Sequence, residues 1–165
     1  MKIQDRSEIE VDEAVEVFDY WTSIRDKKGL PQWSDIKLSD LPAAVLPRCT
    51  VVDVQTDPLD FHYRFWGSGL TPVVGRDMTG RTVRDLQPDG AMRVLFEHYR
   101  DTVQLRWATA HRVEFTIEGS MRVATYALRL PLFADDRTVD KILTIVCYLE
   151  TVDHPTPLVD ARSVF

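Results

Sequence analysis

This chain is poor in cysteine and has no long apolar run. Its 165 residues include only Cys49 and Cys147, which are too few and too far apart for a disulfide framework or a Cys-x-x-Cys metal site. No run approaches the roughly 18 apolar residues of a membrane span, and the first ten residues lack the apolar core of a secretory signal. We therefore expect a soluble cytoplasmic protein with two reduced cysteines and no membrane segment.

Basic residues are outnumbered and scattered. The chain has 20 Lys and Arg against 26 Asp and Glu, which gives a net charge of −6. Direct binding to nucleic acid requires basic side chains that are gathered so that they neutralise adjacent phosphates. The sequence therefore predicts no nucleic-acid partner.

Motifs of common catalytic and metal sites are also missing. The sequence contains no GxSxG, HExxH, P-loop or GxGxxG pattern, and no two histidines have the spacing that places two ligands on one helix face. Gly67 and Gly69 are not followed by the lysine of a phosphate-binding loop, so they predict a tight turn. We expect a protein that is not an enzyme and has no metal site.

An amphipathic helix is predicted over residues 8–27. Ser7 and Glu10 have the spacing of a capping box, and Gly29 with Pro31 marks the end of the helix. Its apolar residues form two adjacent stripes, which is more than one packing contact needs. The second stripe either lies in a groove of its own chain or contacts a second copy. The second reading predicts a homodimer through Val17, Tyr20, Trp21 and Ile24.

The rest of the chain alternates between strands and helices. Residues 30–48 are rich in proline but too apolar for a solvated linker, so we expect them to pack across the domain, with a short helix over 41–46. Period-two patterns predict strands over 49–54, 61–66, 111–117, 122–133 and 141–149, and a helical period predicts a helix over 90–107. This divides the chain into a helix and connector (1–48), a core (49–150) and a tail (151–165).

The order of these elements, with a glycine-punctuated stretch over residues 61–87, resembles a PAS domain. Several motifs resemble a bacterial subfamily of stand-alone PAS proteins: Tyr20-Trp21, Leu46-Pro47, Tyr63-Arg64-Phe65-Trp66-Gly67, Gly75-Arg76-Asp77-Met78 and Leu130-Pro131. The resemblance implies an α+β fold with a five-stranded antiparallel sheet in the order 2-1-5-4-3, helices on one face and an N-terminal amphipathic helix. It also implies a sensory or protein-interaction module that binds a small ligand or an unidentified signalling protein, often as a homodimer.

Polar residues near the expected pocket are candidates for binding a ligand. Tyrosine and histidine side chains could supply the few polar groups of an otherwise apolar pocket, and Arg64 could bind a carboxylate with both nitrogens of its fork. Strand parity turns Arg64 away from Tyr63, however, and favours a salt bridge for it. The remaining candidates are Tyr63, Tyr99, His111, Tyr126 and Tyr148.

Two cofactors are possible by resemblance, but neither is favoured. Haem-binding PAS domains use a histidine on the helix equivalent to residues 90–107, where His98 stands; a neutral histidine packed at the edge of the core is the alternative. Photosensing flavin members carry a cysteine where this chain has Val83, which excludes a cysteinyl photocycle and leaves only simple flavin binding. The sequence assigns no cofactor.

Two other functions remain open. The core could be filled and the protein a ligandless assembly adaptor. A hot-dog thioesterase also combines a central helix with a curved antiparallel sheet, and would use a carboxylate such as Glu97 or Asp101. Both carboxylates are predicted on the solvated face of the helix over 90–107, which argues against that enzyme.

Overall fold

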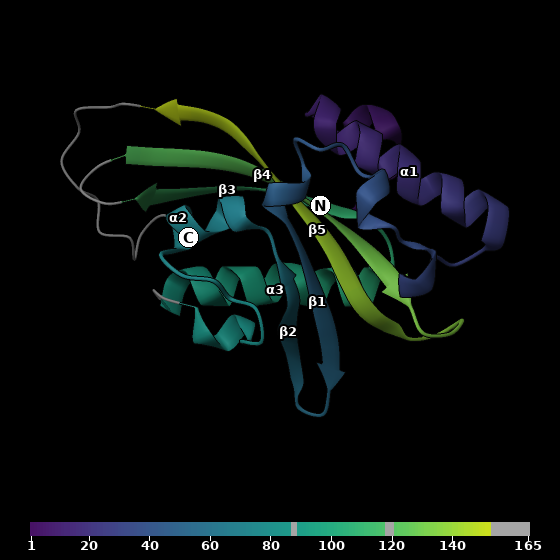
Figure 1. The fold of residues 1–165 in the computed structure, drawn as a ribbon. Helices are drawn as coiled ribbons and strands as arrows, with labels where there is room; N and C mark the ends of the chain where they lie inside the picture. Colours follow the sequence, from purple (N-terminus) through teal and green to yellow (C-terminus); the bar gives the residue numbers. More distant parts are fainter. Residues whose placement is uncertain (87–88, 118–120, 153–165) are drawn as a thin grey trace.

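Short turns between apolar segments produce an antiparallel sheet. The computed structural model describes residues 1–86, 89–117 and 121–152. Its strands are β1 (Cys49–Thr56), β2 (Leu59–Trp66), β3 (Thr109–Ile117), β4 (Met121–Phe133) and β5 (Val139–Val152). They pair in the order β2-β1-β5-β4-β3 (Figure 1), which confirms the predicted sheet. Residues 153–165 of the predicted tail lie outside the described residues.

Helices cover both faces of this sheet. On one face, which we call the α1 face, α1 (Asp12–Lys28) and the connector pack against residues of β1, β4 and β5. On the opposite face, the α3 face, α2 (Thr71–Val74) and α3 (Asp89–Leu105) pack against alternate residues of the same strands (Figure 1). The expectation of helices on one face thus holds for α2 and α3, whereas α1 lies on the other.

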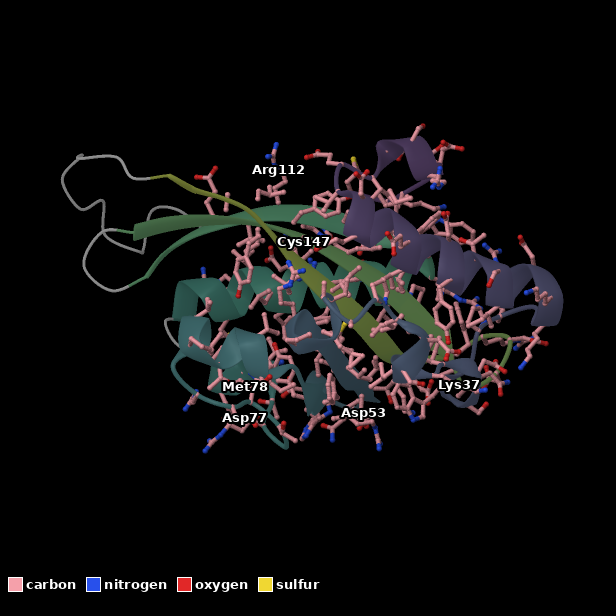
Figure 2. The ribbon with its side chains drawn as sticks, turned by 45° about the horizontal axis from the view of Figure 1, so that its top comes forward. Lys37, Asp53, Asp77, Met78, Arg112 and Cys147 are labelled. Carbon is pink, nitrogen blue, oxygen red and sulfur yellow. The ribbon has the colours of Figure 1, made fainter. Side chains whose placement is uncertain are left out.

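Side chains fill the layers on both sides of the sheet (Figure 2). Cys147 of β5 belongs to the core on the α1 face, and Met78 belongs to the core on the α3 face. Ile36, Leu41 and Val45 of the connector are buried with α1. The prediction that the connector packs across the domain is confirmed.

Two local predictions near the N-terminus are wrong. α1 begins at Asp12 without a side-chain cap, and Ser7 lies in a separate 3-10 turn. The Ser7 hydroxyl donates to the Asp5 carboxylate at 2.7 Å, so this side chain is bonded within the 3-10 turn and not to α1. The predicted helix over 41–46 is also absent: the connector contains only 3-10 turns, at Trp33–Asp35, Leu38–Asp40 and Leu46–Arg48.

The predicted subunit contact of α1 needs a correction. Val17, Trp21 and Ile24 are 0%, 1% and 9% exposed and belong to the chain's own core. The indole nitrogen of Trp21 donates to the Pro131 carbonyl at 3.0 Å. Tyr20 is half-buried and its hydroxyl accepts from the Lys37 backbone at 2.9 Å. The connector and the sheet therefore cover Val17, Trp21 and Ile24 within one chain, and they cover Tyr20 in part.

The turn after β2 depends on the absence of a side chain. A Cβ added at Gly67 would lie 2.3 Å from the Pro47 carbonyl oxygen, and real Cβ atoms do not approach backbone so closely. The Gly67 nitrogen donates to the Cys49 carbonyl at 2.8 Å. This contact ties the end of β2 to the start of β1, as the tight-turn interpretation expected.

Removing the largest side chain of α1 tests its role in the core. We expect Trp21→Ala to lower the free energy of unfolding by about 3–5 kcal/mol, because it opens a cavity and leaves the Pro131 carbonyl unpaired. Urea unfolding of both proteins measures the change. The control is Glu16→Ala on the exposed side of α1, for which we expect little effect. Equal stability of all three proteins would contradict the packing described for α1.

Candidate functional site

Aromatic rings form the apolar part of the layer between α3 and the sheet. Tyr99 of α3 and Phe61 of β2 have ring centroids 5.1 Å apart, and Tyr63 and Trp66 of β2 meet edge to face at 5.0 Å. Tyr99 and Tyr63 are 2% and 3% exposed. The helical period of α3 and the alternation of β2 bring Tyr99, Phe61 and Tyr63 together, as both patterns predicted. Trp66 joins them because the pairing of β1 with β2 shifts register between Val51 and Val52.

A row of polar residues crosses the sheet beneath α3. The strand register places Thr50, Thr144, Arg129 and Thr109 side by side on β1, β5, β4 and β3. All four are at most 3% exposed. α3 meets this polar row through Tyr99, whose hydroxyl is 3.4 Å from the Thr50 hydroxyl, and through Thr102, whose hydroxyl is 2.7 Å from that of Thr109.

Arg129 is the unusual member of the polar row. It is 1% exposed, and no carboxylate within the described residues forms an ion pair with it. Its guanidinium lies 5.0 Å from the Tyr99 ring centroid, and its Nε has no hydrogen-bond partner in the described part of the chain. Burial lowers the pKa of Arg129, yet a guanidinium stays protonated at neutral pH. An unpaired charge is therefore held inside the protein.

Two histidines lie against this charge. The rings of His98 on α3 and His111 on β3 stack with centroids 3.7 Å apart and an angle of 16°. Arg129 Nη1 is 3.4 Å from His111 Nδ1, while His98 Nδ1 is buried and has no partner among the described residues. We call Arg129, His98 and His111 the basic cluster. All three of its side chains are basic.

The turn between α3 and β3 brings the two histidines together. α3 ends at Leu105, β3 begins at Thr109, and Arg106 reverses the chain with φ 51°. Positions before and after this turn then face each other, as the Thr102 and Thr109 hydroxyls also do.

Burial and Arg129 keep both imidazoles neutral. Desolvation, followed by the charge of Arg129, lowers the pKa of His98 to about 3. The same two causes, with a further contribution from His98, lower the pKa of His111 to about 2. The basic cluster therefore carries one charge in the free protein at neutral pH, that of Arg129.

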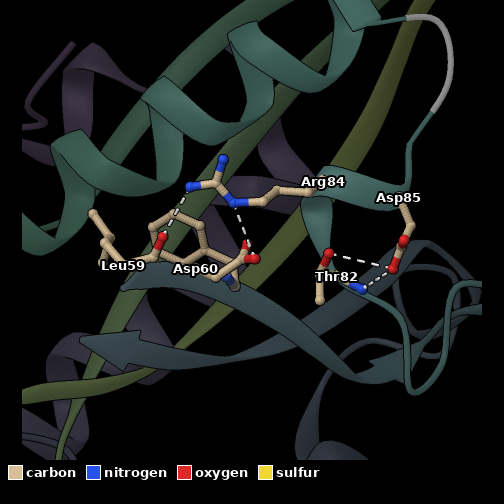
Figure 3. A network of polar contacts seen from close by, with 6 residues as sticks. Leu59, Asp60, Thr82, Arg84 and Asp85 are labelled. Carbon is tan, nitrogen blue, oxygen red and sulfur yellow. Dashed lines mark hydrogen bonds and ion pairs between the residues drawn. The ribbon is translucent and has the colours of Figure 1, made fainter. Parts of the chain in front are cut away.

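The segment before α3 forms a further wall of this layer. Arg84 donates from Nε to the Asp60 carboxylate and from Nη2 to the Leu59 carbonyl, both at 3.1 Å (Figure 3). Thr82 and Asp85 form a capping box, in which the Thr82 backbone donates to Asp85 at 2.8 Å. These bonds hold the 3-10 turn Val83–Asp85 against β2, and the Arg84 guanidinium lies 4.6 Å from the ring centroid of Phe96 on α3.

Comparison with known proteins identifies this architecture. A sequence profile of the PAS domain family matches residues 9–147. The chain belongs to the PAS domain family. A fungal LOV domain photoreceptor has a TM-score of 0.50 and 19% identity, and the match covers 86% of this chain and 96% of that one. At this identity the likeness shows the PAS fold alone.

A bacterial structure is similar at a lower level. The PAS domain of a protein from Colwellia psychrerythraea has a TM-score of 0.45 and 12% identity, and the match covers 61% of this chain and 86% of that one. No curated protein sequence matches the chain. The hot-dog fold considered from the sequence is wrong, because the sheet order and the family are those of a PAS domain.

The cofactors suggested by the PAS resemblance fit this layer poorly. Val83 is fully buried and has no thiol with which to form a flavin thioether. Among the described residues, the ring stacked face to face on His98 is that of His111, and the charge of Arg129 disfavours a metal cation at the buried nitrogen of His98. No group of three potential metal ligands occurs in the described ranges, and none of the described helices is long and apolar enough to span a membrane.

The predicted ligand-binding residues separate into two groups. Tyr63, Tyr99 and His111 lie together on the α3 face. The other three lie elsewhere. Tyr126 is in the core beneath α1, Arg64 pairs with Asp53 at 2.8 Å on the surface, and Tyr148 is 36% exposed. Tyr126 and Arg64 thus lie outside the layer between α3 and the sheet, and Arg64 forms the salt bridge that strand parity had favoured.

Arg129 was missed by the sequence interpretation. Its signal is a charged residue between Leu128 and Leu130, inside a strand that is apolar on both faces. Arginine is almost never fully buried unless it is paired. A strand of this kind with one arginine at its centre indicates a functional residue.

Replacing the buried charge tests whether it supports the fold. We expect Arg129→Met to raise the free energy of unfolding by about 1–4 kcal/mol, because an apolar side chain of similar length removes an unpaired buried charge. Urea unfolding measures the change, and Arg64→Met on the surface is the matched control. A clear loss of stability in Arg129→Met alone would show that Arg129 is structural.

The histidines should make stability depend on pH. Their folded pKa values lie below the unfolded value of 6.5, so the unfolded chain binds more protons below about pH 6.5. Stability is therefore complete above that pH and is lost as the pH falls. The slope is at most about 1.4 kcal/mol per pH unit for each imidazole, and solvent at the partly exposed edges lowers it.

Urea unfolding at pH 7 and pH 5 measures this loss. We expect His111→Gln to lose less stability over this interval than the unmodified protein, because one of the two depressed pKa values is gone. His62→Gln, on the opposite face of β2 from Tyr63, is the control. Identical losses in all three proteins would refute the role of the histidines.

Proposed function

We propose that this PAS domain is a sensory module that receives a small molecule between α3 and the sheet, at Arg129. The observation that carries the proposal is a buried guanidinium with no carboxylate partner in the described part of the chain. A buried charge that lacks a partner costs several kcal/mol. An arginine with such a cost fits a site in which a ligand supplies the missing acceptor.

The surroundings of Arg129 suit a small ligand. Binding sites are mostly apolar with a few polar groups that fix orientation. Tyr99, Tyr63 and Phe61 supply aromatic surface, and the Thr144 hydroxyl has no partner within the described residues. Apolar contact and directional hydrogen bonds are thus available within one layer.

β4 connects the ligand site on the α3 face to the packing of α1 on the other face of the sheet. Arg129 faces α3, while its neighbours Leu128 and Leu130 pack beneath α1. A ligand that shifts Arg129 also shifts the backbone on which α1 rests. We assign the output to an unidentified partner protein at the α1 side rather than to a homodimer through Val17, Trp21 and Ile24, because these side chains are covered.

Family membership supports a sensory or interaction role and does not favour catalysis. In this proposal no residue of the basic cluster transfers a group or cleaves a bond. The basic cluster binds an anion and orients it.

Release of a bound molecule tests the proposal. The protein is purified from its native host, denatured, and the filtrate is analysed by mass spectrometry. We expect one small molecule in the filtrates of the unmodified protein and of Arg64→Met, and its loss from Arg129→Met, because only Arg129 lies in the buried layer. Circular dichroism confirms that each variant is folded.

The other outcomes are informative. Equal amounts of the molecule from Arg129→Met and the unmodified protein would place the ligand elsewhere and refute the site. Repeated absence of any molecule from the unmodified protein would reject the sensor and favour the ligandless assembly adaptor.

A further inference from the structure

We infer that the ligand is a small organic acid, whose carboxylate pairs with Arg129 and whose binding makes the His98–His111 pair take up a proton. This inference rests on the proposed function and deepens it. It comes from the basic cluster, in which three basic side chains from α3, β3 and β4 meet beside aromatic rings.

Hydrogen-bond capacity in the basic cluster is poorly used in the free protein. Every nitrogen of Arg129 is a donor, and its Nε has no partner in the described ranges. His111 has the Met1 nitrogen 3.1 Å from its Nε2 and Arg129 Nη1 3.4 Å from its Nδ1. A neutral imidazole can accept at only one of its two nitrogens. The Tyr99 hydroxyl is a further hydrogen-bond partner of Arg129, but the cluster still has more donors than acceptors.

A carboxylate supplies that acceptor. It has two oxygens with about four lone-pair sites, and it can accept two parallel N–H hydrogen bonds from one guanidinium. Its single negative charge matches the single charge of the free basic cluster. A protonated imidazole, donating from its inner nitrogen, would use the remaining lone pairs. His98 Nδ1 is buried without a partner among the described residues and suits this role.

Proton uptake follows from the charges that face the histidines. Burial, then Arg129 on β4 and the Met1 amino group, disfavours protonation of both rings, and His98 further disfavours protonation of His111 across the stack. On α3, Asp101 is paired with Arg100 at 3.7 Å and lies near the surface, and its negative charge also favours the protonated forms of Arg129 and the Met1 amino group. A bound carboxylate offsets the charge of Arg129 and adds an opposite charge, which favours an imidazolium.

The aromatic surroundings favour an organic acid over an inorganic anion. Tyr99 stacks close to Arg129, and Phe61 and Tyr63 continue the apolar surface from it. Such surface suits a carbon skeleton attached to the carboxylate. Phosphate carries more charge and more acceptors than one guanidinium can satisfy, and it gains nothing from aromatic walls.

Nuclear magnetic resonance of the histidine rings tests the inference. The Cε1 proton and carbon signals of His98, His111 and His62 are followed near pH 6, about the ordinary pKa of histidine, as benzoate, succinate, phosphate or chloride is added. We expect benzoate or succinate to move the signals of the stacked pair toward the protonated position. A free pKa of about 3 leaves His98 neutral near pH 6, so uptake of one proton by the pair requires the pKa of one ring to rise by about three units. His62, which is outside the cluster, should not respond to the acids.

Variants identify the partner of the acid. Arg129→Gln should abolish the response of His98 and His111, and Arg129→Lys, which keeps the charge but loses the fork, should weaken it. The lysine variant keeps the test valid if the glutamine variant does not fold. An unchanged response in both variants would overturn the assignment of Arg129.

The remaining results also decide the inference. No response to either organic acid would overturn it, and a response to phosphate alone would overturn the carboxylate assignment. An uncharged molecule in the mass-spectrometric filtrate would refute this inference while leaving the proposed sensor intact, so the two failures are distinguishable.

Discussion

Burial of both faces of the sheet is the constraint on which the rest of the structure depends. α1 with the connector covers one face and α3 with the short helices covers the other, so alternate residues of β4 enter two different cores. A side chain in the middle of β4 therefore has no direction that leads to solvent. Arg129 occupies such a position, and its charge remains inside the protein with Tyr99 and His111 as neighbours.

This constraint links the chemistry of the site to its mechanics. On the α3 face, burial and then the charge of Arg129 keep the neighbouring imidazoles neutral, because a poorly solvated layer disfavours a second positive charge beside the first. On the α1 face, the leucines that flank Arg129 belong to the core that packs beneath α1. An anion that binds Arg129 would change the charge in the core beneath α3. Through the backbone of β4 it would also shift the leucines that pack beneath α1.

Much of the fold was predictable because its signals are local. The period of α3, the alternation of β2 and the motif order predicted the elements and, through the PAS resemblance, the sheet order. Two local predictions failed. The Ser7 side chain bonds to Asp5 instead of capping α1, and the proline-rich connector forms 3-10 turns rather than a helix. Parity placed Arg64 and Tyr63 on opposite faces, but it could not assign Tyr126, because a strand buried on both sides gives no polar face as a reference.

The sequence by itself determined the kind and order of the elements, the absence of a thiol at Val83 and the family, since all of these depend on residue identity and short-range spacing. Only the tertiary structure decided that the two α1 stripes are covered within one chain, and that His98, His111 and Arg129 meet. Those contacts depend on strand register, on the turn at Arg106 and on which face each helix covers. Register and burial are properties of packing between distant segments, and no local pattern encodes them.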